Sequence, residues 1–121
     1  MLRLILGIVL GVVAWFVVAL GIAYVLRAVA PGLSAQLAVH ATVATLAGRL
    51  AISFIGSLIA GALAATLGGS RAALVAGVLL LLLWGTYHVM VIWHQFPVWY
   101  HLTFFVSLVA LSVLGGQMVR R

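Results

Sequence analysis

Residues 43–93 read VATLAGRLAISFIGSLIAGALAATLGGSRAALVAGVLLLLLWGTYHVMVIW, two long apolar runs separated by the tetrapeptide GGSR at residues 68–71. A helix that crosses a membrane needs about 20 mostly apolar residues, and each run is long enough. Adjacent glycines after an apolar run are typical of a helix end. We therefore predict one membrane span over residues 43–67 and another over residues 72–93.

Two further apolar segments flank this pair. Residues 4–26 form the first, and residues 99–118 follow the segment HQFP, in which proline cannot continue a helix. Residues 27–42 are too polar to span, and we expect a loop there, with a short interfacial helix beginning near Pro31. The sequence thus predicts an all-α, polytopic membrane protein. Its single domain, residues 1–121, would be a compact bundle of four transmembrane helices with both termini on the same side.

The composition supports the membrane class and excludes several kinds of function. Of the 121 residues 68% are hydrophobic and 5% are charged, and the chain has no Asp, Glu or Cys. A soluble domain of this length would carry roughly 15 acidic residues. The chain's own side chains supply no carboxylate pair, no Ser-His-Asp triad and no thiol, so we expect no enzyme activity. The formal charge of +6 comes from scattered arginines rather than a basic patch, and we expect no nucleic-acid binding.

The distribution of arginines predicts the orientation. Four arginines share the side of the two termini and two lie on the opposite side; they are Arg3, Arg71, Arg120 and Arg121, against Arg27 and Arg49. Cytoplasmic loops carry an excess of positive residues, so we expect an inner-membrane protein with cytoplasmic termini. Trp93, Trp99 and Tyr100 would then form an aromatic belt at the outer interface.

Small residues at intervals of four predict how the helices pack. Gly7 and Gly11 have this spacing, as do Gly56 and Ala60. Such positions allow close backbone approach between membrane helices. We expect them to pack within the chain, with self-association as the alternative. The unbroken leucines at residues 79–83 contain no small residue, and we expect them to face lipid.

Arg49 begins a polar stripe that continues at intervals of four through Ser53 and Ser57. An arginine in a membrane span either extends to lipid phosphates at the surface or pairs with an anion inside the protein. The chain has no acidic side chain to pair with it. The second interpretation therefore predicts an anion from outside the chain: a lipid phosphate, a substrate anion or a carboxylate of a partner subunit. Within the chain, the alternative partners are backbone carbonyls and Tyr87.

The histidines lie on the predicted outer side, at His40, His88, His94 and His101. They are interpreted as interfacial anchors, as haem or metal ligands through His88 and His101, or as part of a quinone or lipid-headgroup pocket. That pocket would be lined by Tyr24, Arg49, Tyr87, His88 and His101. No spacing is diagnostic of a metal, and we expect no metal or cofactor. The candidate ligand- or anion-binding residues are Arg49, Ser53, Tyr87, His88 and His101.

The segment Pro97-Val98-Trp99-Tyr100-His101 at the start of the last span, together with the pair Arg49-Leu50, resembles a group of small bacterial inner-membrane proteins. Members of this group have four helices and a similar Pro-x-Trp-Tyr-His segment before the last one. The resemblance implies the fold and the inner-membrane location, and it implies no activity.

Three functions are compatible with these observations. The first is a non-enzymatic structural or accessory protein that packs with itself or with a larger membrane complex and contacts lipids, with Arg49 touching an anion or a partner. The second is an oligomeric transporter or channel for a small anionic or amphiphilic ligand. The third is a haem- or quinone-binding redox subunit that uses His88 and His101.

Overall fold

The computed structural model describes residues 1–32 and 43–119. Its elements in chain order are helix α1 (Leu2–Val29), helix α3 (Val43–Tyr87), the π-helical turn η1 (His88–Ile92), the 3-10 turn η2 (Trp93–Gln95) and helix α4 (Val98–Val119). Most of the expected loop at residues 27–42, including His40, lies outside the described residues, and α1 extends two residues beyond Arg27.

The helical membrane class predicted from the sequence is confirmed. The described part of the chain has three helical stretches long and apolar enough to cross a membrane: Leu2–Val29, Thr45–Gln95 and Val98–Val119. The prediction of four separate spans is not confirmed by this count. The reason is that the expected spans at residues 43–67 and 72–93 belong to one long stretch, which is interrupted inside α3.

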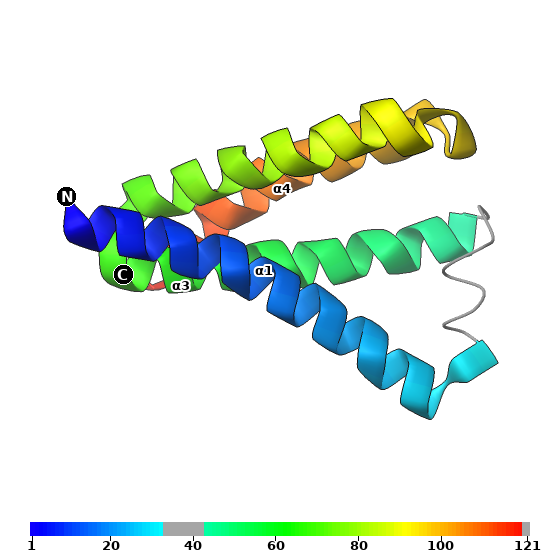
Figure 1. Cartoon of the computed structure of the whole chain (residues 1–121), viewed down its shortest axis with the longest axis horizontal. Helices are drawn as coiled ribbons and strands as arrows, with labels where there is room; N and C mark the ends of the chain where they lie inside the picture. The colour runs from blue at the N-terminus through cyan, green and yellow to red at the C-terminus, as the bar shows by residue number, and fades with distance from the viewer. Residues whose placement is uncertain (33–42, 120–121) are drawn as a thin grey trace.

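The interruption of α3 lies at Gly69, within the tetrapeptide that the sequence marked as a helix end. Gly69 has φ 77° and ψ −171°, a conformation that glycine adopts without the steric cost that a Cβ would bring. Residues 43–68 and 70–87 form two arms that fold back along each other (Figure 1). Figure 1 also places the start of α1 and the end of α4 at the end of the molecule where α3 turns.

Near this turn the helices touch through small residues. A Cβ added at Gly7 would lie 2.5 Å from the carbonyl oxygen of Ala64, and one at Gly11 would lie 2.9 Å from that of Ala60. On the other side, a Cβ at Gly115 would overlap the backbone of Leu58. The expectation that small residues pack within the chain is therefore confirmed. We call this half of the molecule the glycine end.

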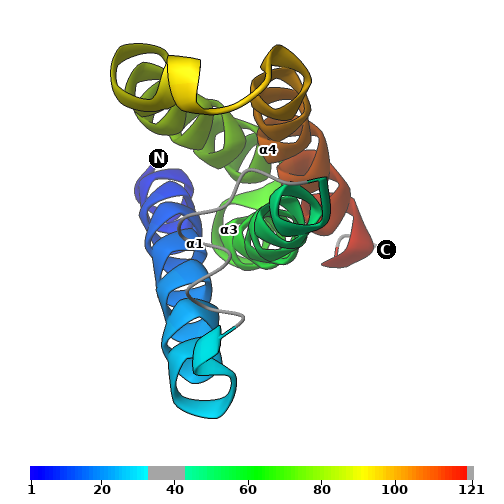
Figure 2. The same ribbon diagram turned by 90° about the vertical axis from the view of Figure 1, so that its right-hand side faces the viewer.

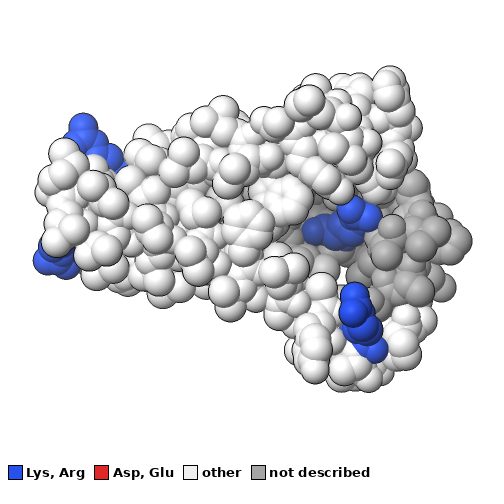
Figure 3. Space-filling view, viewed as in Figure 1, with Lys and Arg blue, Asp and Glu red and all other residues white. Residues whose placement is uncertain are grey.

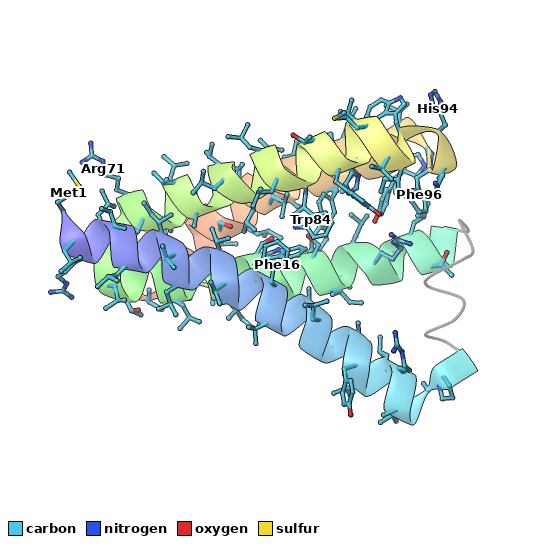
Figure 4. The ribbon with its side chains drawn as sticks, in the orientation of Figure 1. Met1, Phe16, Arg71, Trp84, His94 and Phe96 are labelled. Carbon is cyan, nitrogen blue, oxygen red and sulfur yellow. The ribbon has the colours of Figure 1, made fainter. Side chains whose placement is uncertain are left out.

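The opposite half is packed by aromatic side chains, because α1 leaves the bundle there. Trp15 is 4% exposed, the last buried residue of α1, whereas Tyr24 is 74% exposed. Figures 1 and 2 both show the second half of α1 running away from the other helices. Phe16 and Trp84 face each other across the resulting space, with ring centroids 5.8 Å apart (Figure 4). We call this half the aromatic end.

Two smaller expectations are wrong in part. Leu80 is fully buried in the core rather than facing lipid, because the helical repeat turns one residue of any leucine run toward the bundle, whereas Leu82 and Leu83 are exposed. Tyr100 is 2% exposed and does not belong to an interfacial belt, because it lies on the inner face of α4 with Phe104 and Leu108 at intervals of four. Trp99 remains at the surface, 45% exposed.

Candidate functional site

A cavity of about 190 Å³ lies at the aromatic end, between α1, both arms of α3, η1 and α4. For comparison, a water molecule occupies about 30 Å³ in the liquid, so the cavity has the volume of roughly six waters. Most of its wall is apolar or aromatic. The lining residues are Trp15, Ala19, Ala23, Arg49, Ile52, Ser53, Trp84, Tyr87, His88, Ile92, Tyr100 and Phe104.

Arg49 supplies the positive charge of this cavity. Its side chain is half-buried, its Nε donates a hydrogen bond to Tyr100 Oη at 3.2 Å, and its guanidinium carbon lies 4.6 Å from the centre of the Phe96 ring. Cation–π contact and a phenol acceptor hold the guanidinium in place without neutralising its charge. Figure 3 shows basic side chains in a hollow of the surface beside the splayed half of α1. Arg49 therefore lines a concave site instead of lying along the outer surface of its helix.

Two further residues of the cavity lining, Ser53 and Trp84, carry polar atoms that are themselves buried. Ser53 is 2% exposed, and its Oγ has no hydrogen-bond partner among the residues described; the same holds for the buried Nε1 of Trp84. Burying a hydroxyl or an indole N–H without a partner costs free energy. In contrast, Ser57, one turn further along, accepts a 3.3 Å hydrogen bond from Trp15 Nε1. Of the two serines in the stripe, Ser57 is thus hydrogen-bonded to α1, whereas the Ser53 hydroxyl has no partner in the described part of the chain.

A pair of histidines lies at the η1 side of the cavity, where His88 lines it and His101 of α4 lies behind His88. His88 is 3% exposed and His101 is fully buried, and their Nδ1 atoms are 2.7 Å apart. Nε2 of His101 lies 3.0 Å from the carbonyl oxygen of Trp93, and the Trp93 ring stacks on His101 at 4.5 Å. The π-helical turn His88–Ile92 and the 3-10 turn after it bring the Trp93 carbonyl back toward α4. Irregular turns of this kind occur often at functional sites.

The structure brings together most of the residues that the sequence proposed. Arg49, Ser53, Tyr87 and His88 all line the one cavity, and His101 lies behind His88 and is hydrogen-bonded to it. Tyr24, the remaining member of the proposed pocket, does not line the cavity, since the outward course of α1 leaves it at the surface.

Three participants were missed from the sequence: Tyr100 as the partner of Arg49, the indole of Trp84 and the carbonyl of Trp93. Arg49 and Tyr100 are 51 positions apart, so no local spacing connects them. The interval of four between Tyr100 and Phe104 did carry a signal, because it places both rings on one helical face.

The histidine pair does not fit a metal or haem iron held between its two rings. The contact between the Nδ1 atoms uses the N–H of one imidazole and the lone pair of the other. The second nitrogen of His101 is engaged by the Trp93 carbonyl. In the described ranges no three histidine or acidic side chains gather as metal ligands, and His94 is exposed at the surface. We derive no step through a metal or haem.

Comparisons with models of protein families, with curated proteins and with solved structures found no match for this chain. The cavity and its chemistry are therefore the basis for the functional conclusion.

Proposed function

We propose that this chain is a non-enzymatic integral membrane protein that binds the anionic headgroup of an amphiphile at Arg49. The single observation that carries the proposal is the composition of the cavity wall. Arg49, the unpartnered Ser53 hydroxyl and the unpartnered Trp84 N–H line one small space, in a chain that has no acidic side chain. An anion placed there would accept charge-assisted hydrogen bonds from the Arg49 guanidinium and would give the Ser53 hydroxyl and the Trp84 N–H a partner.

The rest of the wall supports an amphiphile over a purely polar anion. The cavity is lined on the α1 side by Trp15, Ala19 and Ala23, and beyond Ala23 this helix is exposed along its apolar surface. A small anionic headgroup would fill the polar part, while its apolar chains continue along the exposed half of α1. No described feature favours the transporter or the redox alternative in the same way.

The proposal includes four crossings of the membrane. The 45 residues of α3 correspond to about 68 Å of helix, roughly twice the 30 Å hydrocarbon thickness of a bilayer. The break at Gly69 divides this length into two arms that lie side by side (Figure 1). Each arm is thus suited to one crossing, and the arginines near the turn and the N-terminus favour a cytoplasmic location for that end.

Single-cysteine labelling tests this topology, since the chain has no native cysteine. Ser70 and His94 are both exposed and lie at opposite ends of the hairpin. We expect Ser70→Cys to react with a membrane-impermeant maleimide only from the cytoplasmic side, and His94→Cys only from the other side. Labelling of both positions from one side would contradict four crossings.

Lipid binding tests the headgroup site. The purified protein would be titrated with phosphatidylglycerol and, separately, with phosphatidylcholine in detergent, with unfolding temperature as the readout. We expect stabilisation by phosphatidylglycerol, and a loss of affinity of about 10-fold or more in Arg49→Ala, because hydrogen bonds to charged groups contribute about 1.5–3 kcal/mol. Arg27→Ala is the matched control, an exposed arginine of α1 outside the cavity lining. Equal losses in both variants would contradict a specific site.

A further inference from the structure

The hydrogen bonds of the histidine pair determine which nitrogen carries each proton. A carbonyl oxygen only accepts hydrogen bonds, so the 3.0 Å contact with Trp93 requires a proton on Nε2 of His101. In an uncharged His101 the Nδ1 atom is then an acceptor. The 2.7 Å contact between the two Nδ1 atoms therefore places the proton of the bond on Nδ1 of His88.

The uncharged pair is the arrangement that this environment favours. His101 is fully buried, His88 is 3% exposed, and no carboxylate side chain exists in the chain to pair with an imidazolium. Burying an unpaired charge among aromatic rings is costly. With Nδ1 of His88 protonated and the ring neutral, its Nε2 atom presents a lone pair.

The residue that carries this lone pair is part of the cavity wall. His88 is a lining residue, and no hydrogen bond to its Nε2 is formed by the part of the chain that the structure describes. Its ring stacks on Phe104 with centroids 4.5 Å apart and on Tyr100 at 5.9 Å, which fixes its orientation. Tyr100 is also the hydrogen-bond partner of Arg49. The acceptor on His88 and the cation on Arg49 are therefore held by the same tyrosine, on two sides of one small space.

We propose that the headgroup bound in this cavity carries a hydroxyl group as well as a negative charge, and that the hydroxyl donates a hydrogen bond to Nε2 of His88. This inference rests on the proposed function and specifies its ligand. Arg49 and the indole of Trp84 supply donors for the anion, whereas the imidazole of His88 supplies an acceptor that an anion without a donor leaves unpaired. A volume of about 190 Å³ limits the ligand to a small headgroup such as a hydroxylated phosphodiester.

A pair of lipids that differ only in this hydroxylated group tests the inference. Dioleoyl phosphatidylglycerol and dioleoyl phosphatidylmethanol are both anionic phosphodiesters, and only the first has hydroxyls. We expect the wild-type protein in detergent to bind phosphatidylglycerol about 5-fold to 10-fold more tightly, the range of one hydrogen bond. Equal affinity for both, above that for phosphatidylcholine, would overturn the inference and leave the proposed function standing. Binding of both no better than phosphatidylcholine would overturn the proposed function itself.

A substitution at His88 tests whether this residue causes the preference for phosphatidylglycerol over phosphatidylmethanol. His88→Phe keeps an aromatic ring against Tyr100 and Phe104 but has no acceptor, so it should bind the two anionic lipids equally. Arg49→Ala should weaken binding of both. A preference that persists in a folded His88→Phe protein would overturn the assignment to His88. If that variant does not fold, His88→Gln, whose amide oxygen is also an acceptor, takes its place. The preference for phosphatidylglycerol should then persist, and equal binding would overturn the assignment.

Competition by free sn-glycerol 3-phosphate tests whether the bound headgroup belongs to a lipid or to a soluble anion. This compound carries the charge and the hydroxyls but has no acyl chains. We expect it not to compete with phosphatidylglycerol at equal concentration, since it lacks contacts along α1. Competition at equal concentration would overturn the lipid as the source of the headgroup.

Discussion

The glycine end and the aromatic end of this molecule are built from the same helices and differ in how closely those helices approach. At the glycine end, the backbone of Gly61 lies against that of Ser112, and Gly115 lies against Leu58. At the aromatic end, Trp15 and Trp84 hold the helices apart with ring centroids 5.2 Å from each other. Small residues leave no room between membrane helices, whereas large rings leave irregular spaces between them. The candidate site lies at the aromatic end, where the helices are held apart by these rings.

This difference in packing explains why buried serines at the two ends have different surroundings. Ser112 is fully buried at the glycine end against backbone and small side chains, and its Oγ, like that of Ser53, has no hydrogen-bond partner among the residues described. Ser53 is almost as buried, but it is a lining residue of a cavity that Arg49 also lines. The glycine end holds the helices together by close backbone contact, and the aromatic end provides the cavity.

The largest effect is expected at the glycine end. Gly115→Ala places a Cβ onto the backbone of Leu58, which cannot move aside without displacing its helix. We expect a loss of about 3 kcal/mol or more in the free energy of unfolding, measured by denaturant titration in micelles. Gly85→Ala is the matched control, because the nearest atom to its added Cβ is Leu81 Cδ1 at 4.0 Å. That variant should be unchanged or up to about 1 kcal/mol more stable. Equal destabilisation of both would contradict the contrast between the two ends.

An intermediate effect is expected at Ser57, where the two ends meet. Ser57→Ala removes the acceptor for the buried indole N–H of Trp15. We expect a loss of about 1–3 kcal/mol in unfolding free energy, because a buried donor then has no partner. The same micelle titration measures it, and unchanged stability would mean that Trp15 is not held by this bond.

The smallest effect on stability is expected at Ser53, one turn away on the same face. Ser53→Ala breaks no hydrogen bond that the described chain makes, so the unfolding free energy without added lipid should change by less than about 0.5 kcal/mol. Affinity for phosphatidylglycerol should nevertheless fall, since the hydroxyl would contact the headgroup. A Ser53→Ala protein that is as destabilised as Ser57→Ala would show that the hydroxyl serves the fold rather than a ligand.

Local patterns in the sequence predicted what depends on one helix at a time. The glycines at residues 68–69 marked the turn of α3, and the interval of four placed Arg49 and Ser53 on one face of the helix, which the structure turns toward the cavity. Apolar length alone also predicted the membrane class. These features follow from helical geometry and composition, which are properties of short segments.

Features that depend on how helices meet were not predictable in this way. Predicting the contact of Arg49 with Tyr100 would have required the knowledge that α4 lies beside the first arm of α3. The outward course of α1, which leaves Tyr24 at the surface, begins beyond Trp15, whose ring packs against Gly56 and Trp84. The π-helical turn at His88–Ile92 arises within an apolar run that reads as regular helix. Each of these is a consequence of tertiary packing that no single segment encodes.

The central claim, that Arg49 holds an anionic headgroup inside the cavity, is tested most directly by native mass spectrometry of the protein released from mild detergent. We expect the wild-type protein and Arg27→Ala each to retain an anionic lipid, and Arg49→Ala to be released without one. Wild-type protein that carries no lipid, or Arg49→Ala protein that retains an anionic lipid as well as the wild type does, would contradict it.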